Sequence, residues 1–99
     1  MNIPEKIRIG SCDYDVEFTD YDLVANGKES IAIIDYNYHK IKISNKIGDR
    51  QLQELSFLHE MFHGIVRERS LEFEDEELIV EELARSLHQI IRDNSHIFI

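Results

Sequence analysis

Apolar and polar residues alternate strictly along the first part of the chain. Ile7 and Ile9 alternate with basic residues up to Gly10, and apolar residues then alternate with acidic ones up to Phe18. A period of two is typical of a strand with one buried and one solvated face, and glycine is a common turn residue. Residues 5–18 are therefore predicted to form a β-hairpin.

A second alternating stretch begins at Ile31. The segments 31–36 and 41–44 have the pattern of strands, and the polar residues 37–39 between them have that of a bend. We expect this second hairpin to join the first in a small antiparallel sheet. Its return strand, Ile41–Ser44, is expected to lie near the functional site.

The segment between the two hairpins, residues 20–30, shows no such period. It contains Asn26-Gly27, a pair that is typical of turns. We expect a connecting loop here, with a short helical turn at Leu23–Ala25 as the alternative.

The hydrophobic period changes to that of a helix after residue 48. Two long amphipathic helices are predicted, over residues 49–68 with Asp49 as the N-cap and over residues 75–93 with Asn94 as the C-cap. In both, apolar residues recur every three or four positions and form one stripe. The first stripe consists of Leu52, Leu55, Leu58, Phe62, Ile65 and Val66. The second consists of Ile79, Val80, Leu83, Leu87, Ile90 and Ile91.

Apolar residues also lie outside these elements. Leu71 and Phe73 fall between the helices and are expected to be tucked into the core, and the apolar tail 95–99 is expected to pack on the domain or on a partner. Together the elements predict an α+β fold. A small antiparallel sheet of three or four strands would pack on two long helices, in a single domain that covers residues 1–99.

Composition narrows the class of protein. Apolar residues make up 42% and charged residues 31%, as in a globular domain. The formal net charge is −9 and there is no cluster of Lys and Arg, which argues against nucleic acid as a partner. We find no signal-peptide pattern and no apolar run that could span a membrane. The single cysteine, Cys12, fits a reducing compartment, so a soluble cytoplasmic protein is expected.

The first predicted helix carries a His-Glu-x-x-His motif made of His59, Glu60 and His63. Histidines four positions apart lie on one face of a helix and can chelate one zinc ion. Glu60 projects about 100° away from His59, beside such an ion, where a general base for a zinc-activated water is needed. The motif therefore predicts zinc-dependent hydrolysis, most simply of a peptide bond.

A catalytic zinc usually takes three protein ligands and a water, so a third ligand is needed. On the wheel of the second helix, Glu77, Glu81 and His88 fall within about 40° of one another, next to Ala84, whereas Glu82 lies near the opposite edge. We favour Glu81, and Glu77, Glu82 and His88 remain as alternatives. Residues 66 and 69 are Val and Arg, which excludes the Gly and His of the metzincin motif.

Three segments carry a resemblance to a known family: IKIS at residues 41–44, LHEMFHG at residues 58–64 and VEELARSLHQIIRDN at residues 80–94. With them the chain resembles small zincin-like proteins of phages and mobile elements, which are related to the ImmA/IrrE metallo-endopeptidases, a gluzincin group. The similarity covers roughly residues 31–94. It implies a minimal zincin fold and a zinc cofactor.

The resemblance also assigns roles to residues. His59 and His63 would be metal ligands and Glu60 the catalytic base. Glu81 and Ala84 match a Glu-x-x-Ala pattern in which the Glu completes the zinc site. The substrate would be a peptide or protein, which could add as a further strand to Ile41–Ser44.

A competing hypothesis is a non-catalytic zinc-binding module that binds a protein of the phage or of its host. A structural zinc is usually closed by four protein ligands. His88, added to His59, His63 and Glu81, would supply that closure.

Overall fold

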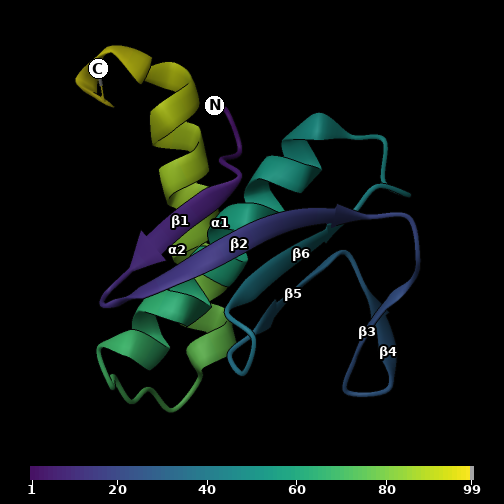
Figure 1. Ribbon diagram of the computed structural model, residues 1–99. Coiled ribbons are helices and arrows are strands. Elements are labelled where there is room, and N and C mark those ends of the chain that lie inside the picture. The colour runs from purple at the N-terminus through teal and green to yellow at the C-terminus, as the bar shows by residue number, and fades with distance from the viewer. Residues whose placement is uncertain (99) are drawn as a thin grey trace.

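The computed structural model describes residues 1–98 of the chain, and Ile99 lies outside the described residues. The α+β fold class is confirmed: two long helices accompany a four-stranded sheet and a separate two-stranded one (Figure 1). In chain order the elements are β1 (Lys6–Ile9), β2 (Cys12–Thr19), β3 (Leu23–Ala25), β4 (Lys28–Ser30), β5 (Ala32–Asp35), β6 (Lys40–Ser44), α1 (Arg50–Glu68), α2 (Glu76–Asp93) and the 3₁₀ helix η1 (Ser95–Phe98).

Both predicted hairpins are present. β1 pairs antiparallel with β2, and β5 pairs antiparallel with β6. The alternation buries one face of each pair, so that Ile9, Tyr14, Ile41 and Ile43 become core residues. The turn after β1 uses Gly10, whose φ of 60° lies in the left-handed region that favours glycine.

The two hairpins do not join as predicted, because β2 and β6 run parallel and the sheet is mixed, in the order β1-β2-β6-β5. Parallel neighbours need a long crossover, and here β3, β4 and β5 lie between β2 and β6 in the chain. β6 is consequently an inner strand with partners on both sides, and the edge strands of the sheet are β1 and β5. The expectation that a peptide could add to Ile41–Ser44 is therefore wrong.

The segment expected to be a loop contains a small hairpin of its own, which forms a second sheet and contacts β5 and β6 (Figure 1). β3 pairs antiparallel with β4 around Asn26 and Gly27, whose φ values are 54° and 74°. Two consecutive residues with positive φ are typical of a type I′ turn, which matches the twist of the flanking strands. Leu23–Ala25 is therefore a strand rather than a helical turn.

Both helices begin and end close to the predicted residues. The Asp49 side chain accepts hydrogen bonds from two backbone N–H groups of the first turn of α1, and Asp75 accepts one from Leu78 in α2. These caps satisfy N–H groups that have no partner within the helix. Asn94 is the C-cap of α2, as expected.

Helix α1 lies between the sheet and α2, and contacts β1, β5 and β6 on one side and α2 on the other. Gly64 makes the close approach to the sheet possible. A Cβ atom at this position would come within 2.9 Å of Ile9 Cδ1 and 3.2 Å of Ile34 Cδ1. The helix is thereby held against the sheet one residue beyond His63.

Fewer residues of α2 are buried in the core than predicted. Since α2 packs mainly on α1, only Val80, Ala84 and His88 are fully buried. The stripe residues Ile79, Leu83 and Ile90 are 37%, 46% and 38% exposed. Their expected burial in the core is wrong.

The connection between the helices also differs from the prediction. Leu71 and Phe73 are 46% and 44% exposed, so they are not tucked into the core. The tail forms η1, which contacts α2, while Ile97 and Phe98 remain exposed. Among the described residues, neither helix is both long and apolar enough to cross a membrane.

Candidate metal centre

His59 and His63 lie one turn apart on α1 and face α2. Their Nε2 atoms are 3.2 Å apart, and each side chain is only 15% exposed. Two nitrogens bound to one tetrahedral zinc ion at about 2.0–2.1 Å would be separated by about 3.3 Å. The two rings are therefore spaced as ligands of a single ion.

A carboxylate of α2 faces both of these nitrogens. Glu77 Oε1 lies 2.7 Å from His59 Nε2, and Glu77 Oε2 lies 2.9 Å from His63 Nε2. Atoms of His59, His63 and Glu77 that could bind a metal all lie within 4.8 Å of one another. This donor set, two imidazoles and a carboxylate, is one that catalytic zinc takes.

The other ring nitrogens also face carboxylates. His63 Nδ1 lies 2.6 Å from Glu76 Oε2, and His59 Nδ1 lies 3.3 Å from Glu81 Oε1. A histidine that binds a metal through one nitrogen usually donates its other N–H to such a carboxylate, which fixes the ring and its tautomer. Glu81, the expected ligand, thus contacts the nitrogen of His59 that points away from Glu77.

The other candidates for the third ligand, His88 and Glu82, lie outside this cluster. His88 is 7% exposed, and its Nε2 lies 3.0 Å from Glu54 Oε1 of α1. It is therefore engaged in a buried pair rather than in the cluster around His59. Glu82 is exposed on α2 and is not among the clustered donors.

His63 lies among carboxylates that favour its charged form. Burial alone would lower the pKa of His63, but the hydrogen bond to Glu76 and the charges of Glu60 and Glu77 outweigh it, and the pKa is raised. An imidazolium surrounded by carboxylates can exchange its proton for a metal cation. The residues present therefore fit a zinc ion.

Glu60 lies next to the histidines but is not among the three clustered donors. Burial raises the pKa of its carboxyl group to about 7, although the neighbouring charges of His59 and His63 lower it. A bound cation would lower this pKa further. Glu60 is therefore placed to accept and return a proton near neutral pH.

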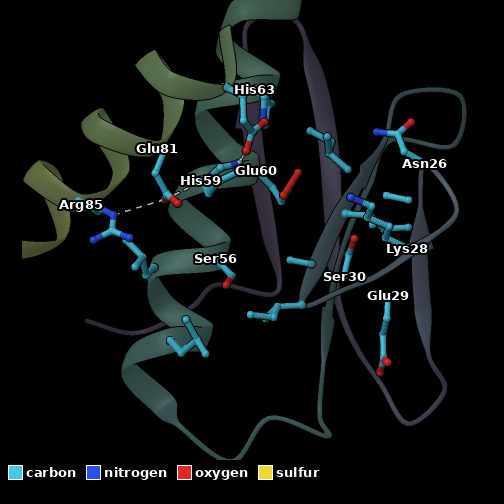
Figure 2. Close-up of a pocket in the computed structure, with 18 of the residues that line it drawn as sticks. Asn26, Lys28, Glu29, Ser30, Ser56, His59, Glu60, His63, Glu81 and Arg85 are labelled. Carbon is cyan, nitrogen blue, oxygen red and sulfur yellow. Dashed lines mark hydrogen bonds and ion pairs between the residues drawn. The ribbon is translucent and has the colours of Figure 1, made fainter. Parts of the chain in front are cut away.

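The cluster opens into a cavity of about 940 Å³ (Figure 2). His59, Glu60, His63 and Glu81 lie on its helical side, and the β3–β4 hairpin with Lys28 and Ser30 lies across from them. β5, one of the two edge strands of the main sheet, forms part of the wall between these sides. The cavity is therefore large enough for several residues of a peptide.

Tyr36, just after β5, is a candidate that sequence reasoning missed. It lines the cavity, and burial together with the charges of Glu76 and Glu60 raises its pKa to about 12. Its hydroxyl group stays protonated at neutral pH and is a hydrogen-bond donor. The guanidinium carbon of Arg67 lies 4.6 Å from the centre of the Tyr36 ring, which holds the ring in place. Nothing in the sequence distinguishes this tyrosine from the three others.

No protein-family model, curated protein or solved structure matches this chain. The resemblance to ImmA/IrrE metallo-endopeptidases therefore stays an expectation that rests on the sequence motifs. Independently of that resemblance, the structure contains a cluster of two histidines and a carboxylate at the wall of a cavity.

Proposed function

We propose that this protein is a zinc-dependent metallopeptidase. One observation carries the proposal: the Nε2 atoms of His59 and His63 converge on Glu77, while both Nδ1 atoms face carboxylates. This arrangement orients two imidazoles for one metal ion and leaves a cavity in front of them.

The chemistry follows from the residues around that position. When bound, zinc supplies a Lewis acid and lowers the pKa of a water molecule beside it. Glu60 takes a proton from the attacking water and later delivers it to the leaving amine. Tyr36 donates a hydrogen bond from the cavity wall to the carbonyl oxygen as negative charge develops on it.

The distances support Glu77 as the third ligand. Glu81 is the ligand that the resemblance implies, and in this proposal it orients His59 through Nδ1. A peptide substrate would add as a strand to β5, whose free edge lines the cavity. The β3–β4 hairpin forms the opposite wall (Figure 2).

The experiment compares wild type with Glu60→Gln after zinc reconstitution, on a complex mixture of peptides whose new termini are read by mass spectrometry. Glu60→Gln keeps the size and the hydrogen bonding of the side chain but removes the base. Zinc content should stay at one ion per chain, and cleavage should fall by a factor on the order of a hundred or more.

Glu82→Gln is the matched control, since it removes a carboxylate from an exposed position of α2, and its activity should equal that of wild type. If zinc-loaded wild type cleaves nothing, or if Glu60→Gln cleaves equally well, the protein is not a peptidase of this kind. A zinc-binding interaction module would then account for the cluster.

A further inference from the structure

Exposed hydrophobic side chains gather in the last third of the protein. Of the twelve large hydrophobic residues that are exposed among residues 1–98, eight follow residue 70. Three of them, Ile79, Leu83 and Ile90, project from α2 within about 40° of one another. We call these three residues the α2 stripe. It extends about 16 Å along the helix, at 1.5 Å per residue.

The fold covers the α2 stripe only in part. Helix α2 packs on α1 through Val80 and Ala84, and the stripe lies beside this contact, 37–46% exposed. Single exposed hydrophobic residues are common on protein surfaces, but a row of them on one helix face is typical of a binding surface.

The charges around the stripe have one sign. Residues 71–98 carry eight acidic and two basic residues, so this segment contributes −6 of the net charge of −9. On the helical wheel, Glu82 and Asp93 both lie along one side of the stripe, while Arg85 and Arg92 lie about 140° or more from its centre. The surface is therefore apolar with an acidic rim.

We propose that the α2 stripe binds an amphipathic helix of another protein, with apolar residues on one face and Lys or Arg beside them. Such a helix would lie along α2, bury the stripe and pair its cations with Glu82 and Asp93. A second copy of this chain fits less well, because it would bring acidic rims of equal charge together. The stripe faces away from Glu77 and Glu81, whereas Glu76, which contacts His63, lies beside its N-terminal end.

The probe is a short synthetic helix of leucine and lysine with one apolar face, labelled for fluorescence anisotropy at physiological salt. A matched peptide in which every lysine is glutamate is the control for charge. We expect the lysine peptide to bind and the glutamate peptide not to bind. The double variant Leu83→Ser with Ile90→Ser should weaken binding by about tenfold or more, because roughly half of two large side chains loses its apolar contact.

Two further variants make the test specific to the surface. Val24→Ser removes a side chain that is 61% exposed on the β3–β4 hairpin and should leave binding unchanged. Glu82→Lys should weaken binding of the lysine peptide, and it decides the charge argument even if the double variant fails to fold.

Three results would overturn the proposal. They are no binding of the lysine peptide, equal binding of this peptide by wild type and Glu82→Lys, or a loss of binding in Val24→Ser as large as that in the double variant. Sedimentation gives a fourth. If wild type is a dimer that Leu83→Ser converts into a monomer, a second copy covers the stripe.

Discussion

At the scale of single residues, the two histidines of α1 are held from both sides. Each Nε2 atom faces Glu77, while the Nδ1 atoms of His59 and His63 face Glu81 and Glu76 respectively. Three carboxylates so close together repel one another unless a cation lies among them. A proton on His63, whose pKa is raised, or a metal ion can supply that positive charge.

The contacts of these carboxylates predict a ranking of zinc affinity. Glu81→Ala removes a partner that orients His59 and should weaken zinc binding by about 10- to 100-fold. Glu77→Ala removes a ligand and should cost more than that. Titration with zinc against a competing chelator measures both affinities. Glu82→Ala should bind zinc as wild type does, since its side chain is exposed on α2. The reverse order for Glu77 and Glu81 would make Glu81 the ligand that the sequence motif implied.

At the scale of elements, the contact between α1 and the sheet places the metal centre. Gly64 faces the sheet at the point where Ile9 and Ile34 leave no room for a Cβ atom. His63 and His59 project about 100° and 140° away from Gly64 on the helical wheel, so any displacement of the helix also moves them relative to β5. The close approach therefore links the packing of the core to the width of the cavity.

Gly64→Ala tests this contact. Alanine favours a helix by about 1 kcal/mol over glycine, but overpacking a core costs about 1–3 kcal/mol. We expect a net loss of about 1 kcal/mol in the free energy of unfolding, measured by urea denaturation. Gly48→Ala is the control, because nothing lies within 4 Å of its added Cβ, and its stability should change little or rise. Equal stabilisation by both substitutions would show that the contact between α1 and the sheet accommodates an added methyl group.

At the scale of the whole molecule, the sheet and helices form a core without the metal. Seven buried residues make up its centre, contributed by the sheet and by both helices. The protein is therefore expected to fold in the metal-free form. Zinc that binds only the native state adds stability by mass action.

Chelation measures this contribution. At zinc concentrations about 100 times the Kd, binding stabilises the native state by about 2.7 kcal/mol. For a chain of 99 residues this corresponds to a shift in Tm of roughly 10–20 °C. Thermal unfolding with zinc, and again after chelator, should show that difference, and His63→Ala should show none. An unchanged Tm in the wild-type protein would mean that zinc does not bind the native state preferentially.

The sequence by itself determined what depends on near neighbours in the chain. Periods of two and of 3.6 residues predicted four strands and both helices, and capping chemistry placed Asp49 at the start of α1 and Asn94 at the end of α2. The spacing of His59 and His63 placed their side chains on one helix face for the same reason. The sequence also indicated the turn at Asn26-Gly27. The hairpin around this turn was not predicted, because each of its strands has only three residues.

Only the tertiary structure decided what depends on how the elements meet. The wheel of α2 gives the direction of each side chain about the helix axis, but the rotation and offset of α2 on α1 bring Glu77, rather than Glu81, to the two Nε2 atoms. The parallel pairing of β2 with β6 likewise rests on a long-range crossover. For the same reason Leu83 is exposed, because an apolar residue is buried only where a second surface reaches it.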